Sequence, residues 1–181
     1  MKKRHLIPAL ALAACFAAPA VAQEARPWYV GVSSGQSHFE NVCSGVDPCD
    51  DRDTNGSIFA GYQFARYIAV EGAWRYFGNA DIGASGAGVK ANAIELDAVL
   101  TLPIWRSFSM LGRIGIFHAN LQGTTNDETN NGATYGWGVQ WDMVEGAALR
   151  LEWQKHPELG GGDFGAETDI DSINLGILFR F

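Results

Sequence analysis

Three histidine-containing segments are the places where this sequence could support nucleophilic catalysis. A serine hydroxyl needs a base within hydrogen-bond reach before it can attack a carbonyl. His38 follows Ser37 directly, so in an extended strand the two side chains would point to opposite faces. The His-Ala-Asn run at residues 118–120 carries no hydroxyl, and the His-Pro-Glu run at residues 156–158 falls in an expected loop. We therefore expect no catalytic residues and interpret these histidines as polar residues at the rim of the fold.

An acidic segment at residues 51–56 reads Asp-Arg-Asp-Thr-Asn-Gly and matches the first half of a calcium-binding EF-hand loop. The twelfth position of such a loop needs a bidentate glutamate, and here that position is Tyr62. We therefore expect no metal site and no cofactor. The acidic residues between positions 47 and 53 are interpreted as a solvated loop, with a low-affinity surface contact to Ca²⁺ as the alternative.

The first 22 residues have the pattern of an export signal. Residues 2–4 are basic, residues 6–18 are apolar, and Ala-Val-Ala at residues 20–22 forms a small-x-small cleavage site. The apolar run is shorter than the roughly 20 residues that a transmembrane helix needs. We predict a Sec signal peptide over residues 1–22 and a single domain over residues 23–181.

The charge of the predicted mature chain limits its partners. Removing residues 1–22 takes away three of the 13 basic residues and none of the 20 acidic ones, which leaves a formal net charge of −10. An acidic chain of this kind is not expected to bind nucleic acid. Only two lysines remain, Lys90 and Lys155, whereas a water-exposed surface usually carries many more. Much of the surface is therefore expected to face something other than water.

The cysteines suggest an extracytoplasmic disulfide. Cys15 lies in the predicted signal peptide, where a Leu-Ala-Ala-Cys run offers lipidation of Cys15 as an alternative. Cys43 and Cys49 are separated by Ser-Gly-Val-Asp-Pro, which can turn tightly enough to bring them together. An even number of cysteines in an exported chain predicts a disulfide between them. The rival interpretation, a metal-binding pair, lacks nearby histidine or cysteine partners.

Apolar and polar residues alternate with a period of two in segments of about ten residues, the length that a tilted strand needs to cross a membrane. Short turns are expected near residues 65–66, 103–106 and 142–146, and long polar loops over residues 40–55, 78–88, 122–132 and 156–167. Alternating short turns and long loops are typical of outer-membrane barrels. We predict eight strands, which begin near Trp28, Ser57, Tyr67, Val89, Ser107, Ala133, Ala147 and Asp169.

The two faces of these strands differ in volume, and this difference indicates which face points inward. One face is almost purely apolar and bulky, as in Ile94, Leu96 and Leu100. The other is small and polar, as in Ala93 and Glu95. An eight-stranded barrel has an interior just wide enough for side chains to fill, so the bulky face cannot fit inside. The pattern predicts an all-β fold, an eight-stranded antiparallel up-and-down β-barrel that spans a membrane and presents its apolar face to lipid.

Aromatic residues are expected at the two membrane–water interfaces, because amphipathic rings favour that position. The residues that lie near predicted strand ends are Trp28, Tyr62, Phe64, Trp74, Tyr76, Trp105, Trp141 and Trp153.

Several short stretches, in order along the chain, resemble the OmpA-like outer-membrane β-barrel family over essentially the whole mature length. They are Trp-Tyr-Val-Gly at residues 28–31, Phe-Ala-Gly-Tyr-Gln-Phe at 59–64, Val-Glu-Gly at 70–72, Leu-Pro at 102–103, Leu-Arg-Leu-Glu at 149–152 and Leu-Gly-Ile-Leu-Phe-Arg-Phe at 175–181. The resemblance covers the transmembrane barrel domain only. No segment resembles a peptidoglycan-binding domain, so no cell-wall tether is expected. Phe179 and Phe181 look like the C-terminal signal that the barrel assembly machinery recognises.

The predicted inward face carries a cluster of charges of both signs. Buried charges must be compensated, so we expect ion pairs, and in OmpA-like barrels such a cluster is similar to the ion-pair network that fills the lumen. The alternative is a gate that opens a narrow pore with small conductance. The residues of this predicted barrel-interior cluster are Glu71, Arg75, Glu95, Asp97, Arg113, Arg150 and Glu152.

The resemblance implies a multi-pass structural protein of the Gram-negative outer membrane that contributes to envelope integrity. Its expected partners are outer-membrane lipid, lipopolysaccharide and the barrel assembly machinery. The external loops are the large water-facing area, so an adhesin that binds a host or other surface ligand is the main alternative. A lipid A-modifying enzyme is less favoured, because the deacylases of this barrel size use a His-x-Ser pair and residues 118–120 read His-Ala-Asn.

Overall fold

The chain is described by a computed structural model over residues 26–39, 49–50, 52–82, 87–122, 127–157 and 169–181. In these residues no helix is both long and apolar enough to cross a membrane. The strands are β1 (Trp28–Phe39), β2 (Cys49–Asp50), β3 (Arg52–Ala65), β4 (Ile68–Ile82), β5 (Ala87–Trp105), β6 (Phe108–Gln122), β7 (Asp127–Val144), β8 (Ala147–His156) and β9 (Ile170–Arg180).

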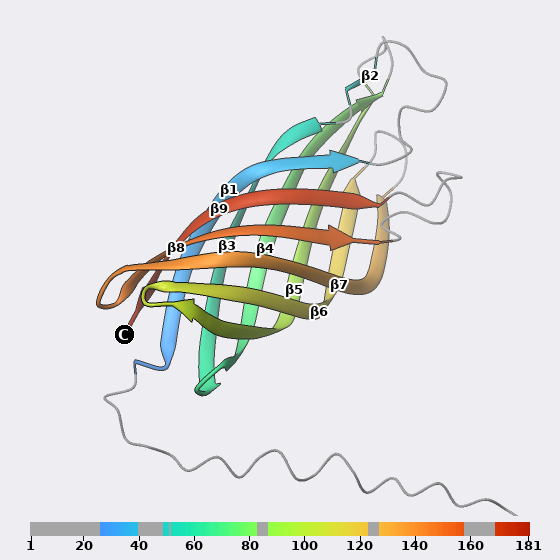
Figure 1. Ribbon diagram of the computed structural model, residues 1–181. Coiled ribbons are helices and arrows are strands. Elements are labelled where there is room, and N and C mark those ends of the chain that lie inside the picture. The colour runs from blue at the N-terminus through green and yellow to red at the C-terminus, as the bar shows by residue number, and fades with distance from the viewer. Residues whose placement is uncertain (1–25, 40–48, 51, 83–86, 123–126, 158–168) are drawn as a thin grey trace, which may run out of the picture.

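The strands form one closed antiparallel barrel (Figure 1). From β3 to β9 each strand pairs with the next along the chain, and β1 joins β3 to β9 and so closes the wall. The two-residue β2 pairs only with the far end of β4, where it continues the line of β3. The wall is therefore the predicted eight-stranded barrel, with β2 as a short extension of β3.

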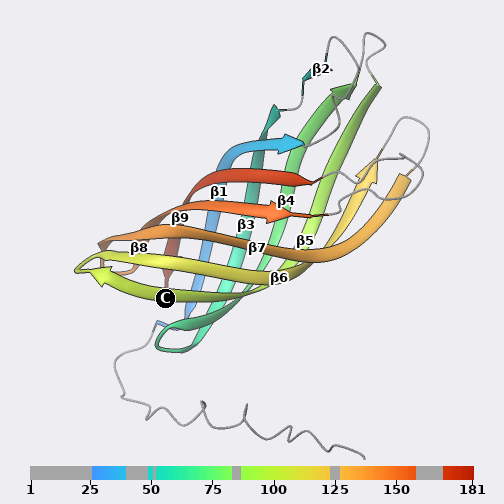
Figure 2. The same cartoon turned by 45° about the vertical axis from the view of Figure 1, so that its right-hand side comes forward.

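The two ends of the barrel differ in their connections. Two-residue turns at 66–67, 106–107 and 145–146 join strands at one end, where β1 begins and β9 ends (Figure 2). We call this the short-turn end and the opposite one the long-loop end. The expected turn at residues 103–106 is wrong, because Pro103 lies within β5 opposite Ser109. A register shift follows immediately between Pro103 and Trp105, and such irregularities are where a strand tolerates proline.

The structure confirms the assignment of faces. The outward set is exposed, with Ile114 at 67%, Ile94 at 62% and Leu96 at 54%. The inward set is buried, with Glu71 and Asp97 each at 1%. A water-soluble barrel would show the opposite arrangement, so this surface suits a lipid environment.

The apolar surface forms a band that ends part of the way along each strand. On β5 it runs from Ile104 to Ile94, ten residue steps, which at about 3.3 Å per residue and a tilt of about 40° give a height of roughly 25 Å. That height matches the lipid-facing band of outer-membrane barrels. Beyond the band the outward positions are polar, as at His118 and Asn120 on β6. The barrel wall therefore continues past the membrane at the long-loop end.

This extension changes the expected positions of the aromatic residues. At the short-turn end, Trp28 packs on Tyr62 with ring centroids 4.7 Å apart, and Phe108 stacks on Trp141 at 6.0 Å. The expectation that Trp74 lies near a strand end is wrong, because it is in the middle part of β4. Trp74 lies instead near the edge of the apolar band on the side of the long-loop end, since the strand continues into water beyond that edge.

Small inward residues make room for the large ones that fill the lumen. A side chain at Gly61 would collide with the ring of Tyr29, and one at Gly132 with the ring of Phe117. Gly115 likewise leaves space for the carboxylate of Asp97. The glycines of the inward face thus allow a narrow barrel to contain aromatic and charged side chains.

Candidate functional site

The candidate site is the middle of the lumen, where four strands bring charged side chains together. Because alternate residues of a strand share a face, β4, β5 and β8 each contribute two of the seven sequence-predicted residues, and β6 contributes the remaining Arg113. All seven are buried, from 1% exposure at Glu71 to 7% at Glu152. We call this set, with Tyr29, Gln154 and His156, the ionic core.

Glu71 is the central acceptor of the ionic core. Arg150 donates to its Oε2 at 2.8 Å, and the hydroxyl of Tyr29 donates to the same oxygen at 2.9 Å. Arg113 pairs with its Oε1. One carboxylate from β4 therefore neutralises guanidinium groups from β6 and β8 across the barrel. Rings of Tyr29 and Phe59 lie 5.6 and 5.3 Å from the guanidinium carbon of Arg150, which adds cation–π attraction.

Glu95 forms a second centre nearer the long-loop end. Arg75 Nε donates to its Oε1 at 2.9 Å, and the amide of Gln154 donates to its Oε2 at 3.2 Å. Nε2 of His156 lies 2.7 Å from Oε1. Arg75 also donates to Gln154 at 2.7 Å. Ion pairs and amide bonds therefore link β4, β5 and β8 at this level.

Arg113 joins the two centres, because it pairs with Glu71 and its Nη1 donates to Oε1 of Gln154 at 3.3 Å. Its contacts with two further carboxylates are longer. Its distances to Asp97 and Glu152 are both 3.7 Å, so these are ion pairs without hydrogen bonds. In the described residues neither carboxylate oxygen of Asp97 has a hydrogen-bond partner, and the same holds for Nε of Arg113. The ionic core is thus fully paired at Glu71 and incompletely hydrogen-bonded at Asp97.

Apolar layers lie in the lumen on both sides of the ionic core. Toward the short-turn end lies a cluster that includes Phe59, Leu111 and Leu178. Toward the long-loop end lies a cluster that includes Phe77, Phe117 and Ile170. The ring of His156 sits between those of Phe77 and Phe117, at centroid distances of 4.8 and 5.4 Å. Aromatic side chains therefore occupy the lumen on both sides of the ionic core.

Sequence reasoning missed several members of this site. His156 was expected in a loop at the rim, but it ends β8 and is fully buried in the lumen. Alternate residues of β8 point inward, and His156 continues the inward series of Arg150, Glu152 and Gln154. Phe77 and Phe117 lie within the expected strands, but only the charged residues of the inward face were singled out, so this apolar layer was missed.

The remaining sequence-predicted sites lie outside the lumen or outside the described residues. His118 faces outward on β6, with its Nδ1 2.7 Å from the amide oxygen of Asn131. Phe179 and Phe181 are 52% and 63% exposed at the short-turn end. Cys49 pairs through β2 with β4, whereas Cys43 and the predicted signal peptide lie outside the described residues. In the part of the chain that the structure describes, no group of side chains could hold a metal ion.

A closed antiparallel wall, an apolar outer band and a filled polar lumen define a transmembrane β-barrel of the outer-membrane class. Residues 8–181 match the outer membrane protein beta-barrel domain, and the chain belongs to that family. It is 26% identical over 196 residues to Outer membrane protein A of Escherichia fergusonii, with coverage of 100% of this chain and 56% of that protein. The chain therefore spans about half the length of this relative.

Solved structures show the same fold. Neisserial surface protein A superposes with a TM-score of 0.63 at 12% identity, over 85% of this chain and 97% of that one. Ail, the attachment invasion locus protein of Yersinia pestis, superposes with a TM-score of 0.54 at 16% identity, over 86% and 99%. The protein is thus an OmpA-like structural barrel of the Gram-negative outer membrane, surrounded by lipid and lipopolysaccharide.

A closed barrel of this kind should migrate differently on a denaturing gel with and without boiling. The hydrogen-bonded wall is closed on itself, so cold detergent has no free strand edge from which to unfold it. We expect the outer-membrane fraction to give a compact band unheated and a shifted band after boiling. A protein recovered from the soluble periplasm without a heat-dependent shift would contradict the lipid-facing assignment.

Proposed function

We propose that the chain contributes to the integrity of the outer membrane as a permanently closed barrel and displays its long connections at the cell surface. The observation that supports this proposal is the filled lumen, in which apolar layers enclose the ionic core. Such an interior favours a rigid scaffold over a transport path. The conserved topology of the class places the short-turn end in the periplasm and the long-loop end outside.

Envelope integrity can be tested by deleting the gene and measuring uptake of an apolar fluorescent dye and sensitivity to a large antibiotic. We expect both to rise in the deletion strain and to return to wild-type levels on complementation. A matched complementation uses a chain whose residues 158–168 are replaced by Asn-Gly, which should leave the wall intact. Unchanged dye uptake in the deletion strain would argue against an integrity role.

The surface-binding alternative rests on the long connections from β1 to β3 and from β8 to β9, and on the extension of β5, β6 and β7 beyond the apolar band. Loops carried on a rigid wall are well placed for recognition. The same Asn-Gly replacement provides the test, because it keeps the heat-dependent gel shift while removing one external loop. Loss of adhesion with a normal gel shift would support an adhesin, and unchanged adhesion after replacement of each loop would count against one.

A narrow pore is the second candidate, favoured by the incomplete hydrogen bonding at Asp97 and Arg113. Groups without fixed partners can exchange partners or take up water, and a partner exchange could open a path. In planar bilayers we expect the wild-type protein to show at most small, brief conductance steps. Phe117→Ala removes one of the two phenyl rings of the long-loop apolar layer and should increase the step size. Equal conductance in both proteins would show that this layer does not limit a path.

We propose no catalytic role for the chain. His118 faces outward and contacts an amide, and His156 lies inside the lumen against a carboxylate and two phenyl rings. Neither arrangement supplies the hydroxyl–base pair that acyl transfer needs. The test is the mass spectrum of lipid A, which should be the same after deletion and after overexpression. A changed acyl pattern would overturn this part of the proposal.

Phe181 is proposed to act in assembly by the barrel assembly machinery. Its side chain is exposed directly after the end of β9, two residues beyond the exposed Phe179. We expect Phe181→Ala to reduce the heat-shifting protein in the outer membrane several-fold while leaving unassisted folding into lipid vesicles unchanged. Phe64→Ala, an exposed aromatic substitution on β3, is the control and should assemble normally. An equal loss in both variants would indicate a general packing effect.

A further inference from the structure

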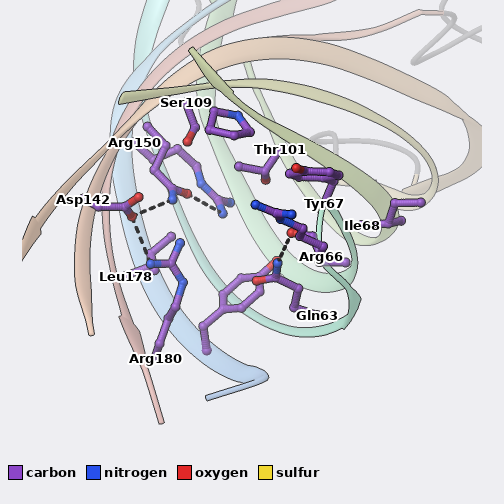
Figure 3. A pocket seen from close by; sticks show the side chains of 14 residues that line it. Gln63, Arg66, Tyr67, Ile68, Thr101, Ser109, Asp142, Arg150, Leu178 and Arg180 are labelled. Carbon is purple, nitrogen blue, oxygen red and sulfur yellow. Dashed lines mark hydrogen bonds and ion pairs between the residues drawn. The ribbon is translucent and has the colours of Figure 1, made fainter. Parts of the chain in front are cut away.

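A cavity of about 290 Å³ opens at the short-turn end of the barrel, below the apolar layer that contains Leu178. We call it the vestibule and define it by Arg66, Thr101, Ser109, Gln140, Asp142 and Arg180, with Arg150 at its inner end (Figure 3). Its lining comes from strands all round the barrel and from the turn between β3 and β4. The vestibule lies at the opposite end of the barrel from the external loops, and its inner end reaches Arg150 of the ionic core.

More arginines than carboxylates line the vestibule, although the whole chain is acidic. Three arginines line it against one carboxylate, Asp142. Asp142 is held between two donors, because Arg180 donates to it at 2.9 Å and the amide of Gln140 donates to it at 2.9 Å. Arg180 is therefore neutralised locally. Arg66, on the exposed turn, adds positive charge at the opening.

The inner end of the vestibule is built from buried polar groups. Arg150 is 3% exposed, Gln140 is 1% and Ser109 is 6%. Arg150 uses one terminal nitrogen for Glu71, at 2.8 Å, and the other for Gln140, at 3.4 Å. Its Nε has no hydrogen-bond partner among the described residues. Arg150 therefore keeps one unused donor at the inner end of the cavity, where a bound acceptor would complete its hydrogen bonding.

We propose that the vestibule binds a small hydroxylated carboxylate, such as a sugar acid, from the periplasm. Guanidinium groups match a carboxylate, and the hydroxyls of Thr101 and Ser109 match the hydroxyls of a polyol chain. The volume lies at the lower end of ligand-binding pockets, which suits a ligand of monosaccharide size. This binding does not depend on whether the lumen conducts ions or the barrel supports the envelope.

The test is calorimetric titration of the full-length protein in lipid nanodiscs with D-gluconate at low ionic strength. Sorbitol, which has the same hydroxyls but no charge, and inorganic phosphate, which has charge but no polyol chain, are titrated in parallel. We expect saturable binding of gluconate, no detectable binding of sorbitol, and phosphate binding weaker by about fivefold or more, since hydroxyl contacts add to the charged one. Equal binding of phosphate and gluconate would refute recognition of the hydroxyls, and equal binding of sorbitol would refute recognition of the carboxylate.

Two variants locate the binding in the vestibule without touching the ionic core. Arg66→Gln removes the charge at the opening and should weaken gluconate binding about fivefold, and Thr101→Val should weaken it about threefold while keeping a β-branched shape. Arg106→Gln is the matched control, because Arg106 is an exposed turn arginine at the same end that does not line the vestibule. Equal losses in Arg66→Gln and Arg106→Gln would show diffuse charge attraction instead of a site.

Discussion

Replacement of Glu71 by glutamine is expected to lower the free energy of unfolding by about 3–5 kcal/mol, because it leaves buried guanidinium groups without their counter-charge. Glu71 accepts from Arg150 and Tyr29 and pairs with Arg113, and it is 1% exposed. Glutamine keeps the shape but carries no charge, so two arginines lose their main partner at once. The measurement is urea-induced unfolding in lipid vesicles, followed by tryptophan fluorescence.

A matched control separates this effect from a general loss of negative charge. Glu145 lies on the turn between β7 and β8, where its side chain is 90% exposed and 3.8 Å from Arg26. Exposed pairs of this kind contribute little, so Glu145→Gln should unfold at the wild-type urea concentration. If Glu71→Gln also unfolds at that concentration, the ionic core does not hold the strands together. Adding Arg150→Met to Glu71→Gln should restore part of the stability, since it removes one of the unpaired charges.

The pairings around Glu71 show what the sequence could not supply. The alternation of apolar and polar residues along each strand placed Glu71, Arg113 and Arg150 on the inward face. This assignment needs only the two-residue period of a strand. It could not say which charges meet. Glu71 and Arg150 are 79 residues apart and lie on β4 and β8, so their contact depends on the shear of the barrel and on side-chain length. Those quantities follow from the register of the whole wall.

The ends of the strands were harder to predict for a different reason. Alternation is visible only where one face meets lipid and the other meets the lumen. Beyond the apolar band the outward face becomes polar, as at His118 and Asn131, which pair across β6 and β7, whereas the inward face is apolar. Backbone pairing continues there although the apolar and polar faces have changed places. This is why the inward Phe77, Phe117 and His156 were not recognised as a layer of the lumen.

The number of strands and their antiparallel direction could be predicted from the sequence, because they depend on the volume of the side chains and on the short turns between strands. Bulky residues such as Trp137 could not enter an eight-stranded interior, and the structure leaves Trp137 56% exposed. Short turns also set antiparallel pairing directly. Errors in individual turns, such as the one at Pro103, shifted strand ends by a few residues without altering the topology.

Substitution of Leu100 by arginine should cost about 2–4 kcal/mol of unfolding free energy in a bilayer, although Leu100 is on the surface. It faces outward from the middle of the band on β5 and is 42% exposed. On a water-facing surface such a change would leave stability nearly unchanged. Here the guanidinium would enter hydrocarbon without a partner, so the variant should unfold at a lower urea concentration in lipid vesicles.

Asn92→Arg provides the matched comparison on the same strand. Asn92 faces outward as well, but it lies beyond Ile94, where the apolar band ends. Its replacement should leave the unfolding transition unchanged, because the arginine would reach water or lipid headgroups. Both variants add one positive charge to β5, so a difference between them reports depth in the bilayer and not charge. Equal stability of the two variants would mean that the band at Leu100 does not lie in hydrocarbon, since only a water-facing surface accepts arginine at both positions.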